Sequence, residues 1–523
     1  MTEKIKKNSN YLRGTIAEDL KNQVTGSVTS DSHQLIKFHG IYEQDDRDRR
    51  NIRAKKKLEK DYSFMIRLRI PGGRISAKQW IGINQTADEY STGAIKITTR
   101  QTVQLHGVIK SQMRPTIQAF DKINLDSIAA CGDVNRNVIA SVFGENTDDL
   151  HKLAVNISEE FLPKTNAYKE IWLDGEKIEQ ENEPLYGDTY LPRKFKIAIA
   201  NPPFNDVDVY AHDIGLIRVQ GGYNILVGGG MGMTHGNADT YPRVGSAIGY
   251  IDEGKILDVI KNIILIQRDF GNRENRKQAR LKYTIDRLSL EWFISELHKR
   301  LGYELEQSKV FKFTQRADNF GYNNNERSFT LFVENGRVLG DVKEALKEIA
   351  EQGVGIFTFT NNQNVIIDEI TDKVKLQTIL DKYNLHNNYS NITKAAMACV
   401  AFNTCPLALA EAQRYLPSLL TKIEELLRKY KIAEETISIR MTGCPNGCAR
   451  PYLAEIAFVG KALGVYNMYL GADALGQRLN KLYKESLKEE DILSELDIMF
   501  DSFVGSRNAN EGFGDYIVRK KII

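Results

Sequence analysis

Apolar and polar residues alternate in a short stretch early in the chain. From Phe64 to Ile70 the alternation has the period of two that is typical of a half-buried strand, and it ends in a turn at 71–73. Residues 77–90 have the spacing of a helix, and residues 94–107 that of a further strand region. Together these elements predict an α+β unit.

The same order of elements returns in the second half of the chain. A strand-like stretch at 328–338 and a strand region at 355–367 flank a helical stretch. The spacing of equivalent positions differs by one residue: 26 positions from Arg74 to Arg100, and 25 from Arg337 to Asn362. This agreement indicates an internal repeat.

A second pair of segments extends the repeat. Residues 221–228 correspond to residues 464–471, so each half is expected to hold an α+β unit followed by a larger α/β unit. A ligand is expected between the halves, because pockets favour domain interfaces. The predicted divisions are an N-terminal arm at 1–60, then units at 61–120, 121–320, 321–390 and 391–523.

Composition narrows the classes of protein. The chain has 42% hydrophobic and 27% charged residues and a net charge of +3, which excludes a disordered protein and argues against a nucleic-acid or membrane-surface partner. The first thirty residues are too polar for a signal peptide, and no apolar run could span a membrane. Five cysteines in 523 residues fit a reducing cytoplasm.

Four cysteines form two close pairs, Cys399 with Cys405 and Cys444 with Cys448. Thiolates are soft ligands, and four of them complete one zinc site or one [4Fe–4S] cluster. Structural zinc sites usually separate paired cysteines by two to four residues, whereas five and three residues intervene here. The spacing favours a cluster and leaves zinc or unligated core cysteines open.

Other features have ordinary interpretations. The mixed-charge run at 43–50 is expected to be a solvated arm or exposed helix. The glycine-rich stretch at 228–236 lacks the spacing of a nucleotide-binding loop and predicts a structural turn. His106 is expected to be a structural histidine, and Cys131 a buried, inert thiol.

Longer motifs carry a resemblance to a known family. The stretch 440–448, its continuation to 461 and the upstream cysteine pair resemble the sirohaem and [4Fe–4S] motif of sulfite and nitrite reductases. Residues 10–20, 135–137, 191–196 and 510–515 look like those of the assimilatory sulfite reductase haemoproteins within that family. The resemblance covers nearly the whole chain. It implies a pseudo-two-fold α+β fold of three lobes, with ferredoxin-like units and larger sirohaem-binding units.

The resemblance also implies roles for particular residues. Cys399, Cys405, Cys444 and Cys448 would hold the [4Fe–4S] cluster, and Cys448 would also be the axial ligand of the sirohaem iron. The many carboxylates of sirohaem would be bound by Lys96, Arg100, Arg193, Gln363, Asn446 and Arg450. Lys96 stands where relatives carry arginine, which keeps the charge but loses the bidentate fork.

The implied activity is the six-electron reduction of sulfite to sulfide, in sulfate assimilation and cysteine biosynthesis. Arg67, Arg136, Lys194 and Lys196 would bind the sulfite anion and relay protons. No flavin or NADPH module is recognisable, so a flavoprotein subunit is the expected electron donor, with ferredoxin as the alternative. A nitrite reductase of the same fold and a zinc-stabilised, non-enzymatic binding protein are the rival functions.

Overall fold

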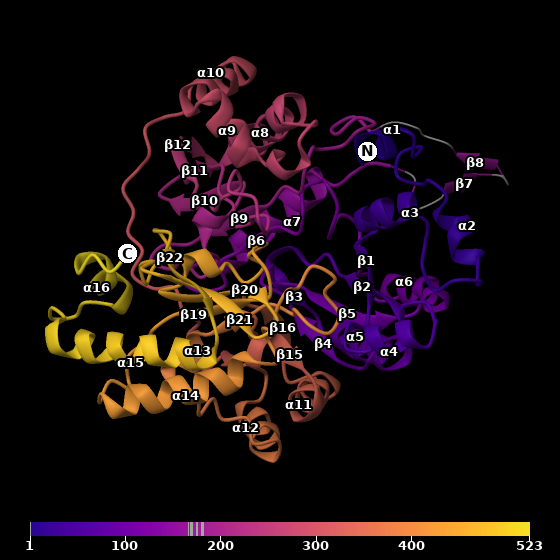
Figure 1. Ribbon diagram of the computed structural model, residues 1–523. Coiled ribbons are helices and arrows are strands. Elements are labelled where there is room, and N and C mark those ends of the chain that lie inside the picture. Colours follow the sequence, from indigo (N-terminus) through magenta and orange to yellow (C-terminus); the bar gives the residue numbers. More distant parts are fainter. Residues whose placement is uncertain (1, 166, 168–170, 174–175, 179–182) are drawn as a thin grey trace.

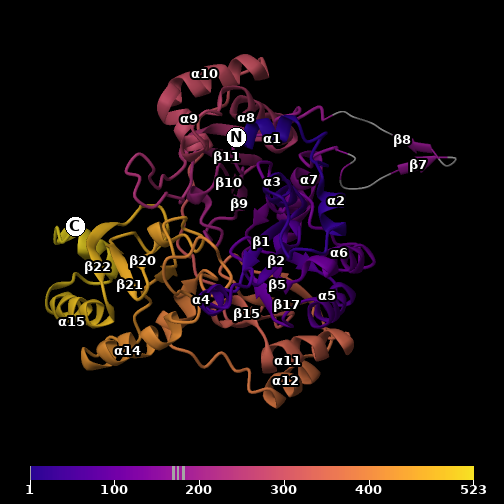
Figure 2. The same ribbon diagram turned by 45° about the vertical axis from the view of Figure 1, so that its right-hand side comes forward.

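The computed structural model describes residues 2–165, 167, 171–173, 176–178 and 183–523. In this part of the chain four sheets have five strands each, and β7 (Ile171–Leu173) pairs with β8 (Glu176–Ile178) in a separate hairpin. Figures 1 and 2 show three lobes, with α8–α10 in one, α14–α16 in another, and α5, α6, α11 and α12 in the third.

Two of the sheets exchange a strand between the halves of the chain. The first sheet has the order β1 (Ile41–Asp45), β2 (Tyr62–Arg67), β5 (Val103–Val108), β4 (Ile95–Ile97) and β15 (Arg337–Val338). Its counterpart has the order β13 (Gly321–Asn323), β14 (Ser328–Leu331), β17 (Val365–Asp368), β16 (Ile356–Phe359) and β3 (Arg74–Ile75). Each half thus supplies the edge strand of the other, and one apolar core joins both.

The two larger sheets repeat one topology. One has the order β12 (Ser246–Asp252), β11 (Gly222–Val227), β10 (Ile214–Val219), β9 (Ile197–Ala200) and β6 (Ile139–Ala140). The other has the order β18 (Met397–Ala398), β19 (Ile439–Thr442), β20 (Ile456–Ala462), β21 (Val465–Leu470) and β22 (Lys481–Leu487). In each, three parallel strands are followed by two antiparallel ones. Residues 221–228 and 464–471 were expected to be equivalent copies, and they contain β11 and β21, which hold the same position in the two sheets.

Helices cover these sheets. They are α1 (Thr2–Lys7), α2 (Ile16–Lys21), α3 (Ser30–Leu35), α4 (Arg50–Lys55), α5 (Ala77–Tyr90), α6 (Met113–Asp121), α7 (Thr147–Glu160), α8 (Ile256–Phe270), α9 (Leu281–Leu288), α10 (Leu290–Leu301), α11 (Gly340–Glu351), α12 (Lys373–Lys382), α13 (Asn391–Ala395), α14 (Leu416–Lys429), α15 (Glu489–Ser506) and α16 (Phe513–Arg519). The expected helix at 77–90 has these bounds because Ser76 and Gln79 form a capping box. None of the helices in the described residues combines the length and apolarity that crossing a membrane requires.

Two glycines show how closely the halves agree. A Cβ on Gly73 would lie 2.7 Å from the Phe359 carbonyl oxygen and 2.9 Å from the Cβ of Gln101. A Cβ on Gly336 would lie 2.5 Å from the Ile97 carbonyl oxygen and 2.9 Å from the Cβ of Gln363. Both glycines have positive φ, 78° and 67°. The turns therefore need glycine for the same two reasons, backbone conformation and close approach.

The mixed-charge run at 43–50 differs from the expected solvated arm. Residues 43–45 belong to β1, which pairs with β2, and Asp45 is buried against Arg50 with an Oδ1–Nη2 distance of 2.6 Å. Arg47 extends from this segment to residues 403–408 of the other half. The expectation was wrong for residues 43–45, because paired charges and strand hydrogen bonds offset the cost of burying polar groups. Asp48 and Arg49 are exposed as expected, and α4, which begins at Arg50, has no buried residues.

Candidate functional site

The cysteine pairs follow neighbouring parallel strands. Cys399 comes directly after β18, and Cys444 lies two residues after β19, so both pairs lie at the carboxyl ends of these strands. The backbone N–H of Cys399 donates to the Met441 carbonyl at 3.2 Å. The N–H of Gly443 donates to the Cys399 sulfur at 3.4 Å. The fold thus brings together two pairs that lie about forty residues apart in the chain.

The four thiols are close enough to influence one another. Burial raises the pKa of Cys444 to about 12, and Cys448 adds to that shift. Burial, then Cys448 and Cys444, raise the pKa of Cys399 well above its usual value. Four thiolates in such a place need a cationic centre to hold them together.

The chemistry of this donor set bears on which centre it fits. Among the described residues no group of three or more His, Cys, Asp or Glu is arranged to hold a single metal ion. Four thiolates from two neighbouring loops are the donor set that a [4Fe–4S] cluster takes.

Cys448 connects the cysteine pairs with cations of the first half. The residue is exposed, and its carbonyl accepts a hydrogen bond from the Thr99 hydroxyl at 3.0 Å. Electrostatic interactions connect its thiolate with Lys194 and Lys196. The second half of the chain therefore presents a thiolate to cations from the first half.

The structure brings the four expected substrate cations into one neighbourhood. Burial, then Arg193, Arg280 and Arg136, lower the pKa of Lys194 to about 7. Burial and the neighbouring Lys194 lower the pKa of Lys196 well below its usual value. Both lysines flank Phe195, which is fully buried, and the Arg136 N–H donates to its carbonyl at 2.9 Å.

Arg67 completes this group from the first sheet. Its Nη2 donates to Gln104 Oε1 at 2.8 Å, and its Nη1 donates to the Cys131 sulfur at 3.2 Å. His106 lies beside it, with Gln104 and Gln44 each within 2.9 Å of one ring nitrogen. Burial, then Arg67, lower the pKa of His106 to about 3. A neutral histidine with both nitrogens engaged agrees with a structural role.

Most residues expected at the cofactor lie near the same place. Lys96 is buried, donates to the Asn335 carbonyl and lies close to Cys399. Arg100 Nε and Gln363 Oε1 are buried without a hydrogen-bond partner among the described residues. Asn446 donates to the Cys444 sulfur at 3.4 Å. The unmatched buried N–H of Arg100, beside other cations, fits a carboxylate-rich group such as sirohaem.

Arg193 and Arg450 have different surroundings. Arg193 Nη1 lies 4.0 Å from Asp133 Oδ1, and its side chain is one third exposed. The guanidinium of Arg450 is buried and donates to Asp208 at 2.5 Å, to the Thr99 carbonyl at 3.0 Å and to the Asn361 carbonyl at 3.1 Å. Arg450 is therefore held by protein acceptors on all three nitrogens.

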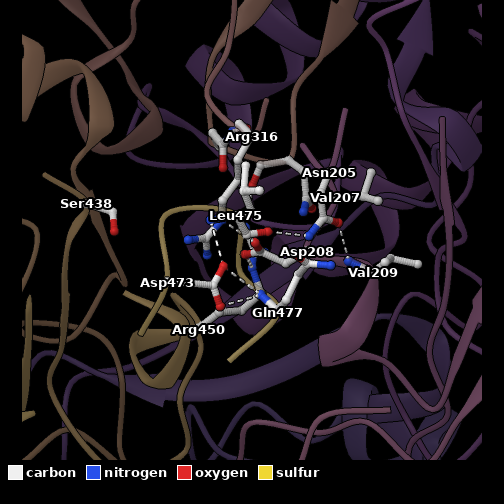
Figure 3. Close-up of polar contacts among 12 residues, drawn as sticks. Asn205, Val207, Asp208, Val209, Arg316, Ser438, Arg450, Asp473, Leu475 and Gln477 are labelled. Atoms are coloured by element: carbon white, nitrogen blue, oxygen red, sulfur yellow. Dashed lines mark hydrogen bonds and ion pairs between the residues drawn. The ribbon is translucent and has the colours of Figure 1, made fainter. Parts of the chain in front are cut away.

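Asp208 is the centre of this buried network (Figure 3). Its Oδ1 accepts from Arg316 Nε at 2.7 Å, and its Oδ2 accepts from Arg440 Nη1 at 2.7 Å and from Arg450 Nε at 2.5 Å. Burial alone would raise the pKa of Asp208, but the three guanidinium groups hold it well below its usual value. Asp208 thus joins the first half of the chain to the cysteine-bearing half.

Sequence analysis missed Asp208 and several cations near the site. Arg280 donates to Asp213 at 2.6 Å, and Lys282 donates to the Gly230 and Gly232 carbonyls at 3.1 and 2.9 Å. Nothing in their spacing distinguishes them from surface charges. For Asp208 the internal repeat was a usable signal. Asp208 directly precedes the 3-10 turn Val209–Ala211, just as Arg450 directly precedes the 3-10 turn Pro451–Leu453.

Fold and site together define a two-fold repeated α+β protein in which four clustered cysteines of one half lie near cations of the other. The ferredoxin-like half domain of nitrite/sulfite reductases matches residues 56–123, and the nitrite and sulphite reductase 4Fe-4S domain matches residues 154–305. The latter segment contains none of the five cysteines. It belongs to the first copy of the unit whose second copy carries four of them.

Curated relatives cover the whole chain. "Sulfite reductase [NADPH] hemoprotein beta-component" of Leptospira biflexa is 54% identical over 100% of this chain and 98% of its own length. The protein of that name from Staphylococcus epidermidis is 50% identical over 100% of this chain and 95% of its own length. The chain belongs to the nitrite and sulfite reductase family.

A solved structure supports the fold. The Mycobacterium tuberculosis NirA protein superposes with a TM-score of 0.82 at 24% identity, covering 99% of this chain and 95% of that one. At this identity the likeness concerns the fold alone, which agrees with the expected pseudo-two-fold α+β architecture.

Proposed function

We propose that this protein is the haemoprotein subunit of an assimilatory sulfite reductase, which reduces sulfite to sulfide by six electrons for cysteine biosynthesis. The near full-length identity to the named relatives supports this activity. The observation that carries the proposal is that Cys448 lies close enough to Lys194 and Lys196 of the other half for their charges to interact.

Cys399, Cys405, Cys444 and Cys448 hold a [4Fe–4S] cluster in this proposal, and Cys448 also ligates the sirohaem iron. When bound, these two groups store electrons and deliver them to sulfite. The chain positions the thiolates from two parallel strands and directs the Gly443 N–H at Cys399. Such N–H groups stabilise the thiolate charge.

Six side chains bind or support sirohaem in this proposal: Lys96, Arg100, Arg193, Gln363, Asn446 and Arg450. The unpartnered Nε–H of Arg100 is suited to direct contact with a carboxylate. Arg450 supports the site indirectly, since its three nitrogens donate to Asp208 and to the Thr99 and Asn361 carbonyls.

Arg67, Arg136, Lys194 and Lys196 bind sulfite and supply protons. Their positive charges offset the charge of the anion, and their partial burial strengthens that attraction. A lysine with a pKa of about 7 can give up and regain a proton near neutral pH, as Lys194 would have to do when oxygen leaves sulfite as water. The bound anion raises that pKa again, so the lysine is protonated when substrate is present.

The electron donor is a flavoprotein subunit that oxidises NADPH, with ferredoxin as the alternative. The names of the relatives, which are NADPH-dependent beta components, support the first donor.

A cytoplasmic location fits the free thiols. The units at 61–120 and 321–390 share one apolar core. In this proposal the unit at 121–320 supplies substrate cations, and the unit at 391–523 supplies the cysteines that hold the cluster.

Purification of the holoprotein under nitrogen tests the proposal. We expect four cluster irons plus one haem iron per chain, and sulfide formation from sulfite with a chemical reductant. A lower turnover of nitrite than of sulfite supports the sulfite assignment, whereas the reverse identifies a nitrite reductase. A colourless protein with one zinc would overturn the proposal. Addition of NADPH with the flavoprotein, or of reduced ferredoxin, identifies the donor.

A further inference from the structure

The charged segment after β1 reaches the loop that carries Cys405. The Arg47 N–H donates to the Asn403 carbonyl at 3.0 Å. Its Nη1 donates to the carbonyls of Cys405 at 3.2 Å, Pro406 at 3.4 Å and Ala408 at 2.6 Å. Its guanidinium carbon lies 4.6 Å from the centre of the Phe402 ring. The backbone and the side chain of one residue from the first half therefore hold residues 402–408 of the second.

A second ion pair fastens the same segment nearby. Asp48 Oδ2 lies 2.7 Å from Arg414 Nη1, just beyond the cysteine loop. This pair is exposed and contributes little by itself. The Asp48–Arg414 pair keeps the charged segment close to the cysteine loop. The Arg47 side chain therefore reaches the carbonyls of this loop from a fixed position.

The turn that Arg47 holds also surrounds the Cys405 thiolate. Within this turn the backbone N–H of Cys405 donates to the Ala401 carbonyl at 2.9 Å, and that of Ala408 donates to the Cys405 carbonyl at 3.3 Å. Pro406 provides no N–H, and Leu407 is 62% exposed, so neither side chain anchors the turn. By accepting from Arg47, the carbonyls of Cys405, Pro406 and Ala408 fix the backbone that carries the Cys405 thiol.

Arg47 also contributes a charge that no carboxylate neutralises directly. Its neighbours are already paired, Arg50 with Asp45 and Arg49 with Asp61. Within the described residues no carboxylate oxygen forms an ion pair with Arg47. Its positive charge therefore acts on the cysteine loop, where reduction of a cluster would add a negative charge.

We propose that Arg47 is a positioning residue of the cluster centre: it pins the turn around Cys405 and raises the reduction potential of the bound cluster. This inference rests on the proposed function, since it takes the four cysteines to hold that cluster. Hydrogen bonds to the sulfurs and nearby charge are two of the influences that set such potentials.

Three variants of the holoprotein separate pinning from charge. Arg47→Gln removes the charge and the guanidinium hydrogen bonds, Arg47→Lys keeps the charge but lacks the planar guanidinium that lies over Phe402 and reaches the three carbonyls, and Arg49→Gln removes an exposed charge from the same segment. The midpoint potential of the cluster is measured by a titration followed by electron paramagnetic resonance. The rate of iron loss is measured with an excess of an iron chelator.

Arg47→Gln is expected to shift the midpoint to a more negative potential and to lose iron several times faster than the unaltered protein. Arg47→Lys is expected to keep the potential and still lose iron faster, and Arg49→Gln to change neither. Equal potentials and equal iron loss in Arg47→Gln and Arg49→Gln would overturn the inference. If Arg47→Gln does not fold, unchanged iron loss in Arg47→Lys overturns it. An unaltered protein without a cluster refutes the proposed function instead.

Discussion

The loops that follow β9 and β19 occupy equivalent places in the two halves, yet they carry opposite chemistry. Each contains a residue in the left-handed region before a short 3-10 turn, Asp208 with φ 48° and Arg450 with φ 52°. The two side chains pair with each other across the interface at 2.5 Å. The comparison shows how a repeated scaffold can become complementary to itself, a carboxylate in one copy holding a guanidinium in the other.

The rest of these loops differ further. The loop after β19 carries Cys444 and Cys448, whereas the loop after β9 carries no cysteine. Lys194 and Lys196 lie in the segment directly before β9. The cysteines thus come from one half, and the four cations expected to bind sulfite come from the other. A site built in this way is complete only when the interface is intact.

The largest expected effect tests the cysteine-bearing half. Cys448→Ser should abolish sulfite reduction, because it removes a cluster ligand and the proposed link to the haem iron. Iron content, the visible spectrum and sulfide formation measure this. The matched control is Cys131→Ser, which lies outside the cysteine pairs and should retain the full iron content. A Cys448→Ser protein with both cofactors and full activity would contradict the assignment.

The next effect breaks the pairing between the halves. Asp208→Asn leaves three buried guanidinium groups without their shared carboxylate, and it should cost about 3–5 kcal/mol. Denaturation in urea measures the loss. Asp48→Asn removes an exposed carboxylate from its pair with Arg414 and should cost at most about 1 kcal/mol. Equal costs would show that the Asp208 network does not stabilise the interface.

The pH dependence of that difference sharpens the test. The folded protein holds the pKa of Asp208 well below the unfolded value of about 3.9, so its contribution is fully present above that value. It is lost as the pH falls from about 4 toward the folded pKa. The stability gap between the unaltered protein and Asp208→Asn should therefore be constant from pH 6 to 8 and narrow at pH 3. A gap that widens in acid would contradict the pairing.

A smaller effect is expected in the cation-bearing half. Lys194→Ala should lower sulfite turnover about 10²-fold and leave the visible spectrum largely unchanged, because it removes a proton donor and a charge rather than a cofactor ligand. Lys299→Ala, at a largely exposed position, is the control and should turn over sulfite normally. Loss of the cofactor spectrum in Lys194→Ala would reassign this lysine to a structural role.

The smallest effect compares the two turns directly. Gly73→Ala and Gly336→Ala each force a positive φ on alanine and bring a Cβ within 3 Å of a carbonyl oxygen of the other half. Each should cost about 1–3 kcal/mol. Similar shifts in the urea midpoint of the two variants would show that the two turns contribute equally to stability, as the two-fold repeat predicts. A marked difference would show that the turns have diverged.

Local structure was largely predictable because it depends on neighbours in sequence. The helix at 77–90 and the strands on either side were expected from periodicity, and the Ser76–Gln79 capping box explains where the helix begins. The repeat was visible from spacing alone. The strand exchange of β3 and β15 was not, since two-residue strands carry no pattern and their partners lie in the other half.

Long-range polar contacts were equally hidden. Arg47 and Arg49 stand two positions apart in the same charged run, yet only Arg47 holds the Cys405 turn. Arg450 was expected at the cofactor by resemblance, and the structure shows its donors directed at Asp208 and two carbonyls. Residue type does not distinguish these cases, because the partners are set by folding.

The sequence by itself determined the repeat, the cysteine spacing and the motifs that place the chain in its family. These are properties of order along the chain, and turns and strands follow from them locally. Only the tertiary structure decided which charges share a space. Cys448 lies near Lys194, Asp208 holds Arg450, and Arg47 reaches Cys405, since burial and proximity depend on how segments hundreds of residues apart pack together.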